Sequence, residues 1–521
     1  MKNLEKKQIS RRDFLKTAAV GAVGVASVGL LSACGSGTGA ATPAPTQAPE
    51  PSGIAWDREA DVVIVGSGGT GVSAAYEAAK AGVDTLILEK AGVAGGTTNY
   101  SGGVMQAAGT SVQKELTPYQ NDTPEQHYQL WLESGEGTVD PDLVKDLAYG
   151  APGHVDWLKD ELGMKFVSVY GHCHVPYIDD TLYADRIHVY EGGGGMGGGS
   201  ILVQTILTAA QALGAALELD TEVTKLYTDE SGAVIGVAAK NKDGSFNLKA
   251  NKGVILAASS IDWNETMCRD MSPQQYWDLT SQMCLSASTN TGDGVRMGME
   301  IGATTAGFGG TIDFCGKTGA ATTNAVPLFP SILVNKAGQR FVCEDATYAF
   351  HYRAIFQQEK MFNAPTYMIF GASSLIEGAP WTAESVAKDV ADGVVLTAET
   401  PEALAELIGV NAAGLAATLA DWNAMAAAGT DTKFGRITGI AEITGPFYAY
   451  KNVSYNLGAL GGLKINTDAQ VLRTDGTPIP GLYAGGLNAG GWMGPYYPGS
   501  GTAIMGTLHW GRKAGAAAAK R

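Results

Sequence analysis

Short apolar runs that end in glycine mark the strands of this chain. Residues 61–65 form such a run, Gly66–Gly71 follows at once, and a helical pattern occupies residues 72–81. Residues 85–89 form a second run, which ends in the acid Glu89. This order of strand, glycines, helix, strand and terminal acid predicts the dinucleotide-binding unit of a Rossmann-like α/β fold.

Two later apolar runs extend this sheet. Residues 253–260 and 480–486 each read as a strand bounded by small residues. Both ends of the chain are therefore expected to build one sheet, in a domain made of residues 57–306 and 450–521.

The segment between these parts has a different pattern. Residues 307–449 carry a strand of their own at 331–335 and alanine-rich helices at 382–391 and 401–428. We expect this segment to form an inserted α+β capping domain, with a pocket between it and the sheet. Two domains also suit a chain too long for one ordinary core.

The N-terminus reads as an export signal. Ser10–Lys16 contains the pair Arg11-Arg12, and a mildly apolar stretch follows, which is typical of twin-arginine signals. Leu31–Cys34 resembles a lipobox, so residues 1–34 predict a signal whose Cys34 becomes lipidated, with a flexible tether at 35–56. The alternatives are a membrane-spanning helix and a buried free cysteine. A twin-arginine signal with a lipidated Cys34 would place the protein outside the cytoplasmic membrane, held by a lipid anchor.

Charge and cysteine content exclude several classes of function. The formal net charge is −16, and without residues 1–33 it becomes −20, from 30 basic and 50 acidic residues. Such a chain does not suit nucleic acid as a partner. The five cysteines after Cys34 form no CxxC pair and no haem motif. Electrons must therefore come from, or go to, an external donor or acceptor.

The glycine motif indicates which cofactor binds. Its glycines let a pyrophosphate lie on a helix N-terminus, and Glu89 would bind the adenosine ribose. NAD and FAD both use this unit, but a second loop of small and hydroxyl residues at 95–103 favours FAD. Because no histidine occurs from Ala91 to Gly103, we expect the FAD to be non-covalent. The residues of these two loops expected to bind it are Gly66, Gly68, Gly69, Gly71, Glu89, Gly96, Thr97, Thr98, Ser101, Gly102 and Gly103.

Residues 491–506, GWMGPYYPGSGTAIMG, carry the clearest catalytic signal. Tyr496 and Tyr497, a rigid Pro498-Gly499 turn and the amide of Gly501 supply hydrogen-bond donors spaced like an oxyanion hole. That pattern indicates chemistry beside a ketone. The alternative is a glycine-rich loop that only packs its aromatic rings.

Taken together, these segments resemble a flavoprotein family that includes fumarate reductases, urocanate reductases and 3-ketosteroid dehydrogenases. The resemblance covers about residues 58–518, and residues 334–344 look like the family's hairpin leading into the active site. Fumarate-type members have an arginine where this chain has Tyr348, and a histidine where the segment 457–462 has glycine. The ketosteroid branch has a tyrosine at the first position and closes with a loop that Tyr497–Gly501 matches.

This resemblance implies roles for the site residues. Tyr497 and the Gly501 amide would hold a ketone oxygen, and Tyr348 would move the proton. Tyr177 would assist, with Tyr170 as the competing candidate. The resemblance also implies further cofactor contacts, which are Lys90, Val223, Ala258, Asp293, Gly486, Ser500, Thr502, Ala503 and Ile504. Two departures, at 257–260 and in the glycine-rich stretch 191–199, leave the shape of the pocket open.

The sequence therefore predicts an exported FAD oxidoreductase that acts on a carbon–carbon bond conjugated to a ketone, as in a steroid. One alternative is an enoate reductase, which would need a cation from Arg186, Arg353 or Lys317. A second is a substrate-binding lipoprotein without turnover. The direction favoured is reduction. His172-Cys173-His174 is not expected to bind a metal, because no further ligands lie near it in the sequence.

Overall fold

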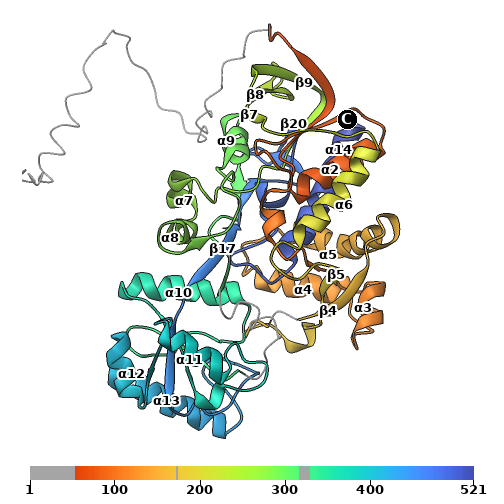
Figure 1. The fold of residues 1–521 in the computed structure, drawn as a ribbon. Helices are drawn as coiled ribbons and strands as arrows, with labels where there is room; N and C mark the ends of the chain where they lie inside the picture. The colour runs from red at the N-terminus through yellow and green to blue at the C-terminus, as the bar shows by residue number, and fades with distance from the viewer. Residues whose placement is uncertain (1–52, 172–173, 316–328) are drawn as a thin grey trace, which may run out of the picture. The chain divides into compact units, whose positions relative to one another are not determined.

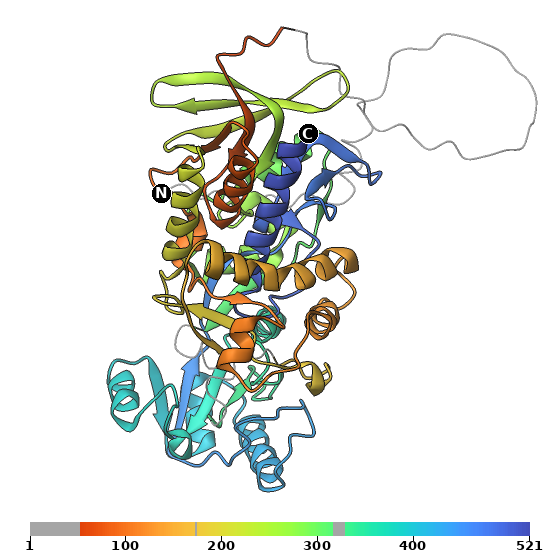
Figure 2. The ribbon, with the colours of Figure 1, turned by 90° about the vertical axis from the view of Figure 1, so that its right-hand side faces the viewer.

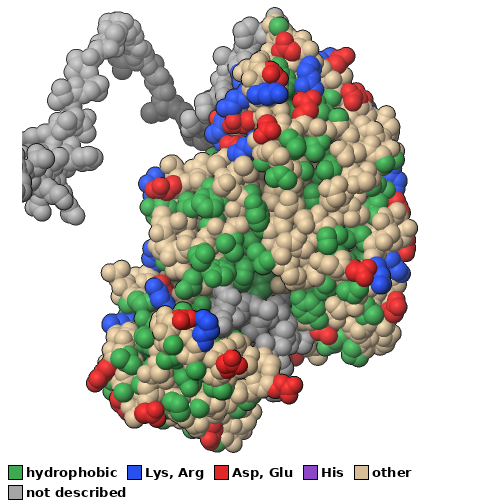
Figure 3. Space-filling model, in the orientation of Figure 1, with side chains coloured by type: hydrophobic (Ala, Val, Ile, Leu, Met, Phe, Trp, Pro, Cys, Tyr) green, Lys and Arg blue, Asp and Glu red, His purple; other side chains and the backbone are tan. Residues whose placement is uncertain are grey.

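The computed structural model describes residues 53–171, 174–315 and 329–521 (Figure 1). The signal, Cys34 and most of the tether lie outside the described residues, as do His172, Cys173 and Lys317. Pro49–Arg521 forms one compact unit. Acidic and basic side chains are interspersed over the face in Figure 3, so its charge is not gathered in one block.

A central sheet of eight strands organises the larger part of the unit. Its order is β19-β20-β9-β1-β2-β6, and β8 pairs with both β7 and β9. The pairs β1–β2, β1–β9 and β9–β20 are parallel. The strands are β1 (Arg58–Val65), β2 (Thr85–Leu88), β6 (Ala216–Glu218), β7 (Glu222–Thr228), β8 (Val234–Asn241), β9 (Gly244–Leu256), β19 (Gln470–Leu472) and β20 (Pro478–Ala484). The prediction that both ends of the chain build one sheet is confirmed.

Helices α2 (Gly69–Lys80) and α14 (Thr502–Lys520) lie side by side against this sheet (Figures 1 and 2). Their backbones touch, because a Cβ added at Gly511 or Gly515 would lie 2.5 or 2.2 Å from a carbonyl oxygen of α2. Helix α6 (Gly199–Ala212) packs against α2 as well. The first and last helices of the described chain thus complete one layer.

Shorter elements surround this core. The helices among them are α3 (Ser111–Leu116), α4 (Pro124–Ser134), α5 (Pro141–Asp156), α7 (Glu265–Met271), α8 (Pro273–Ser281) and α9 (Asp293–Glu300). Three small sheets have the orders β3-β5-β4, β10-β17-β12 and β11-β18-β21. Their strands are β3 (Met105–Gln106), β4 (Phe166–Tyr170), β5 (Ile187–Tyr190), β10 (Met283–Cys284), β11 (Thr305–Ala306), β12 (Thr311–Cys315), β17 (Ser454–Ala459), β18 (Gly462–Lys464) and β21 (Ala489–Gly490).

The inserted part has its own antiparallel sheet, in the order β13-β14-β16-β15. The strands are β13 (Ile332–Val334), β14 (Tyr367–Gly371), β15 (Val395–Ala398) and β16 (Phe447–Lys451). The helices are α10 (Tyr348–Phe362), α11 (Ala383–Ala391), α12 (Pro401–Ile408) and α13 (Ala412–Ala427). Buried Trp422 belongs to an apolar cluster within this part, whereas the cluster around buried Trp381 also includes Trp277 of α8.

The single helix predicted at 401–428 is two helices. Gly409 ends α12 with a φ of +69°, and the Asn411 side chain accepts a bond from the Gly414 amide to begin α13. The alanine-rich pattern continues across this break, so periodicity alone conceals it. The glycine is the signal that should have divided the segment.

Strands β12 and β17 carry the chain out to the inserted part and back. They pair antiparallel, with Phe314 opposite Tyr455. Between them the buried Asp313 accepts bonds from Asn456 Nδ2 at 2.8 Å and Ser454 Oγ at 2.9 Å. Burial raises the pKa of this carboxyl, while these bonds act to lower it. The polar contacts fix the register of the two connections.

Candidate active site

One cavity lies at the carboxyl ends of β1, β2 and β9. The first turns of α2, α10 and α14 also line it. Three of the four predicted catalytic residues line this cavity, namely Tyr348, Tyr497 and Gly501. The predicted cofactor residues that line it are Gly66, Gly68, Gly69, Glu89, Lys90, Gly96, Thr97, Thr98, Ser101, Gly102, Gly103, Val223, Ala258, Asp293, Ser500, Ala503 and Ile504.

Four predicted residues are not in the lining. Gly71 packs against the first loop, since an added Cβ would lie 1.9 Å from Gly66 O. Gly486 packs against Thr70 in the same way. Thr502 is buried and donates to Gly499 O at 2.9 Å. Tyr177, the fourth, lies outside the cavity and is described below.

The glycine loop holds its shape through close backbone contacts. Gly66 has a φ of +102°, and a Cβ there would lie 2.5 Å from Ala257 O. At Gly68 an added Cβ would be in ordinary contact with Gly95 O at 3.7 Å, so no close backbone approach constrains this position, which lines the cavity. Together with the N-terminus of α2, it forms a backbone cradle for an anion.

Glu89 is buried at the end of β2 and is held in one orientation. Its Oε2 accepts bonds from Ser67 N at 2.9 Å and Ser67 Oγ at 2.8 Å, and its Oε1 accepts from Ala91 N at 2.8 Å. A carboxylate has about four acceptor positions. Acceptor capacity therefore remains for the hydroxyls of a ribose.

Lys90 carries the one cationic side chain among the described residues that line the cavity. Its Nζ contacts Asp293 Oδ2 at 2.6 Å and Thr291 Oγ1 at 2.7 Å. The Asp293 carboxylate therefore compensates the positive charge of the Lys90 ammonium group. A carboxylate ligand would have to compete with Asp293 for it.

The second loop, which includes the turn Gly96–Tyr100, joins the first loop to the rest of the site. Thr98 Oγ1 accepts from Gly69 N at 3.1 Å, and Thr97 Oγ1 accepts from Asn290 Nδ2 at 2.8 Å. The glycine-rich stretch 191–199 packs behind it through backbone, since a Cβ at Gly199 would lie 1.9 Å from Thr98 O. Close packing is thus the physical reason for Gly199, whereas an added Cβ at Gly195 or Gly197 would meet nothing within 4 Å.

The other departure, at 257–260, also has a structural reason. Ser259 adopts a φ of +62°, in the left-handed region that glycine occupies more easily. Its Oγ accepts from Asn290 Nδ2 at 3.0 Å, and Ala258 N donates to Asn488 Oδ1 at 3.0 Å. These side-chain contacts stabilise a turn in which glycine is usual.

Tyr348 and Tyr497 face the same cavity from opposite parts of the chain. Their ring centroids lie 6.0 Å apart, and both residues are buried. Tyr348 begins α10, and its hydroxyl lies 3.1 Å from Ser500 Oγ. Ser500 is therefore the hydroxyl that can exchange a proton with Tyr348.

Tyr497 lies at the N-terminus of α14. Its hydroxyl oxygen accepts a bond from Ala503 N at 3.1 Å. An accepted bond from a helix N-terminus polarises the O–H group and makes it a better donor.

Gln106 orients the adjoining peptide. Its Nε2 donates to Ser500 O at 2.9 Å, and its own amide donates to Gly501 O at 3.3 Å. Because C=O and N–H point in opposite directions in a trans peptide, the Gly501 N–H is directed away from Gln106. Buried His127 lies 3.0 Å from Gln106 Oε1 through its Nε2. Sequence reasoning missed Gln106, because it is nearly 400 positions from the loop it supports.

Tyr177 lies beside a different group of residues. Its hydroxyl lies 2.7 Å from the Tyr496 hydroxyl and donates to Glu136 Oε1 at 2.9 Å. Glu136 in turn receives both Arg353 guanidinium bonds, at 2.7 and 2.8 Å. Burial raises the pKa of Tyr177 and that of Tyr496 well above its ordinary value. This cluster joins α10 to the chain between α4 and α5.

The cations expected for an enoate substrate are engaged elsewhere. Arg353 is bound to Glu136, and buried Arg186 forms a two-bond ion pair with Asp122 at 2.8 and 2.7 Å. Neither residue lines the cavity.

An apolar wall of Ile312, Leu457 and Leu487 was also missed. Ile312 and Leu457 belong to β12 and β17, which are short strands without a strong periodic signal.

FAD fits the residues that are present. Gly68 and the N-terminus of α2 line the cavity, and the buried Glu89 beside them has remaining acceptor capacity. Gly66–Gly71 would hold the pyrophosphate, and Gly96–Gly103 would lie along the ring system.

Known proteins resemble this chain over nearly all of its described length. The pattern of the FAD binding domain family matches residues 61–504, and that of the twin-arginine translocation signal matches residues 8–27. Digoxin reductase of Eggerthella lenta is 33% identical over 552 residues, which cover 97% of this chain and 96% of that protein.

Two solved structures share the architecture. A 3-ketosteroid-Δ4-(5α)-dehydrogenase of Rhodococcus jostii RHA1, in complex with 4-androstene-3,17-dione, has a TM-score of 0.77 and 29% identity. It covers 90% of this chain and 99% of its own. The open conformation of a flavocytochrome c3 fumarate reductase has a TM-score of 0.65 and 29% identity, and covers 89% of this chain and 79% of its own. Among the described helices, none has the length and apolar character of a membrane span.

Proposed function

The chain belongs to the FAD binding domain family of flavoprotein oxidoreductases, and we propose that it reduces a carbon–carbon double bond conjugated to a ketone, in a steroid or similar polycyclic enone. The twin-arginine signal directs it out of the cytoplasm. The observation that carries the proposal is the pair of buried tyrosines, Tyr348 and Tyr497, in one cavity with the glycine loop.

Reduction of an enone needs three things at fixed positions. A hydride reaches the β-carbon, a proton reaches the α-carbon, and negative charge develops on the carbonyl oxygen between these events. When bound and reduced by the external donor, FAD would supply the hydride. The protein must then stabilise the enolate and deliver the proton.

The neutral hydroxyls and the amide divide these tasks. The Tyr497 hydroxyl and the Gly501 N–H donate to the ketone oxygen, and Gln106 keeps the amide directed toward it. Tyr348 gives its proton to the α-carbon. Ser500, 3.1 Å from the Tyr348 hydroxyl, returns a proton to the tyrosine. In this assignment Ser500 takes the assisting role first expected of Tyr177.

The charges around the cavity support a neutral substrate. Lys90 is paired with Asp293, and Arg353 and Arg186 are paired with acids outside the lining. A carboxylate substrate buried without a cation would lose several kcal/mol of solvation. The enoate alternative rests on the relatives: a urocanate reductase of Eggerthella lenta is 34% identical to the chain over 490 residues.

The test is to reduce the purified enzyme without oxygen and to add candidate acceptors one at a time. We expect 4-androstene-3,17-dione or another polycyclic enone to reoxidise the flavin, while urocanate and fumarate leave it reduced. Reoxidation by the carboxylates alone would reject the proposal in favour of the enoate reductase.

We also propose that Cys34 carries a lipid anchor and that an external redox partner supplies the electrons. Cys34→Ala should leave the enzyme exported but no longer bound to membranes. Replacing Arg11 and Arg12 by lysine should retain it in the cytoplasm. Unchanged membrane fractionation of the Cys34 variant would contradict the anchor.

A further inference from the structure

Three side chains with metal-binding atoms meet at the edge of the inserted part. His174, Cys343 and Asp345 each offer one ligand atom, and these atoms all lie within 4.8 Å of one another. Cys343 Sγ is 2.9 Å from Asp345 Oδ1, and His174 Nε2 is 3.6 Å from the same oxygen. All three side chains are buried.

The fold brings these residues together from distant parts of the sequence. Thr347 N donates to His174 O at 2.9 Å, which fixes the histidine beside the segment that leads into α10. Asp345 uses its other oxygen, Oδ2, to accept from the amides of Ile437 and Thr438 at 2.9 and 2.8 Å. Its Oδ1 therefore faces the cysteine and the histidine.

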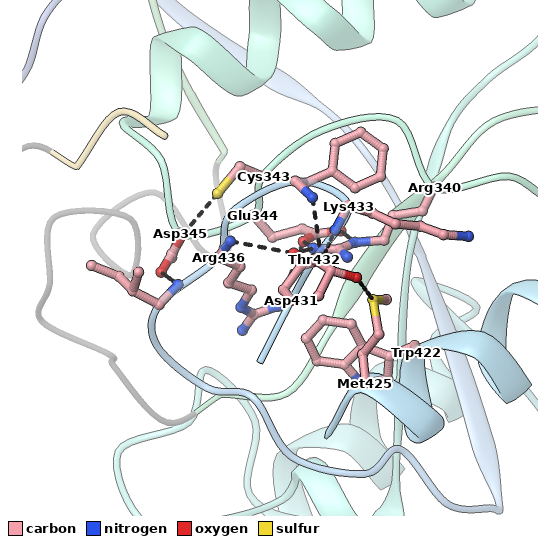
Figure 4. A network of polar contacts seen from close by, with 12 residues as sticks. Arg340, Cys343, Glu344, Asp345, Trp422, Met425, Asp431, Thr432, Lys433 and Arg436 are labelled. Carbon is pink, nitrogen blue, oxygen red and sulfur yellow. Dashed lines mark hydrogen bonds and ion pairs between the residues drawn. The ribbon is translucent and has the colours of Figure 1, made fainter. Parts of the chain in front are cut away.

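A network of ion pairs holds the segment that carries Cys343 and Asp345 (Figure 4). Arg340 binds Glu344 and Asp431, with Nε to Glu344 Oε1 at 2.7 Å and Nη2 to Asp431 Oδ2 at 2.6 Å. Arg436 lies 3.7 Å from Glu344. Because Glu344 lies between the two ligand residues, this network positions them before any ion binds.

We propose that His174, Cys343 and Asp345 form a binding site for a soft divalent cation, with Zn²⁺ as the best match. Imidazole, thiolate and carboxylate are all zinc ligands, at about 2.0–2.1, 2.3 and 2.0–2.2 Å respectively. A tetrahedral site with such lengths separates its ligand atoms by ~3.5 Å. The distance from His174 Nε2 to Asp345 Oδ1, 3.6 Å, matches this, while Cys343 Sγ, now 2.9 Å from the same oxygen, would move away from it as an ion enters. The thiolate and the carboxylate balance the charge of the ion, so the buried site would be neutral.

A neighbouring cavity lies beside the site. Cys343 is among its lining residues, together with Pro176, Phe341 and Arg353. In the proposed site, an ion would enter from this side and a water molecule would complete four-coordination. A bound ion would connect the segment that begins at His174 to Asp345, which lies three positions before Tyr348 at the start of α10.

The competing interpretation is a hydrogen-bonded cluster without a metal, in which the Cys343 thiol donates to Asp345. The two interpretations differ in whether the sulfur can become a metal ligand.

The experiment uses the full flavin-bound chain, purified without a histidine tag, loaded with Zn²⁺ and then dialysed. We expect about one zinc per chain by elemental analysis. X-ray absorption at the zinc edge should show one sulfur at about 2.3 Å with nitrogen and oxygen at about 2.0–2.2 Å. No retained zinc, or bound zinc without a sulfur neighbour, would overturn the proposal.

Substitutions test whether Cys343 and Asp345 bind the ion. Cys343→Ser should remove the sulfur signal, and Asp345→Asn should lower zinc retention while keeping the volume of the side chain. Cys268→Ser is the matched control, because Cys268 is another buried thiol and its Sγ lies 3.1 Å from Ile261 O. If Cys343→Ser does not fold, protection of Cys343 from alkylation by Zn²⁺ in the unaltered protein gives the same answer, and equal alkylation with and without zinc rejects the site. Neither measurement depends on the proposed function.

Discussion

The two halves of the cavity differ in composition, because one is formed chiefly by backbone and the other chiefly by side chains. The half expected to hold the cofactor consists of backbone: glycines at 66–71 and 95–103, the N-terminus of α2 and one buried acid. The half beside α10 and α14 consists of side chains, chiefly Tyr348, Tyr497 and Ser500. The first half recognises groups that every FAD shares, whereas the second can change substrate when a few side chains change. Substitutions in each half should therefore fail in different ways.

The largest effect is expected in the backbone half. In Gly71→Ala the new Cβ would lie 1.9 Å from Gly66 O, so the loop and α2 cannot keep their positions. We expect the purified protein to lack flavin, measured as the ratio of visible to ultraviolet absorbance. Gly153→Ala is the control, because a Cβ there has open space and lies inside α5. A yellow Gly71→Ala protein would show that the loop tolerates expansion.

Tyr348→Phe should retain flavin and ligand binding but lose turnover. The ring still packs, while the proton-donating hydroxyl is gone, so reoxidation of the reduced flavin by an enone should slow ~10²- to 10⁴-fold. Stopped-flow absorbance measures this step directly. An unchanged rate would remove Tyr348 from the mechanism.

Tyr497→Phe should weaken both binding and rate. It removes a donor to the developing enolate, and loss of one such donor costs on the order of 10²- to 10³-fold in rate. Binding of a ketone ligand to the oxidised enzyme should fall as well, which distinguishes this residue from Tyr348. Equal ligand affinity in the variant and the parent would contradict the oxyanion-hole role.

Gln106→Leu should have a smaller effect of the same kind. Loss of a hydrogen bond worth ~1.4 kcal/mol corresponds to about tenfold in rate. The rate should fall while flavin content stays constant, because Gln106 orients the Gly501 amide beside the two tyrosines and does not contact the glycine loops. Gln113→Leu is the control, since Gln113 is also buried and hydrogen-bonded but contacts Asp122 instead of the loop. Equal rate losses in both variants would indicate a general effect on stability.

The smallest effect is expected at the Glu136–Arg353 pair, outside the cavity. The Arg353 bonds lower the pKa of Glu136, so the pair stabilises the folded state above the unfolded pKa of the acid and loses this effect as pH falls through the folded pKa. Glu136→Gln should cost about 0–1 kcal/mol at neutral pH and nothing in acid. Thermal unfolding at several pH values measures this difference. A difference that grows in acid would contradict the sign.

The two halves also differ in how well the sequence predicts them. The residues that bind the cofactor through backbone lie in contiguous motifs, so the sequence alone predicts the two loops and Glu89. Tyr497 was indicated by its own loop, but its role and the choice of Tyr348 rested on the resemblance to a known family. Long-range contacts place Ile312 at the cavity, Gln106 beside Ser500, and Tyr177 beside Tyr496 and Glu136. Local patterns do not encode such contacts, and the break at Gly409 shows that they also conceal element ends.

The contact between α2 and α14 sets an order for assembly during synthesis. The backbone of α2, which follows the cofactor loop, packs on Gly511 and Gly515, which are made long after it. A ribosome-bound chain without α14 therefore lacks one wall of the cofactor cavity, even when its first strands have formed. Because the twin-arginine route carries folded proteins, cofactor loading and release for export would both wait for α14. Loss of α14 would then be seen first as failed secretion.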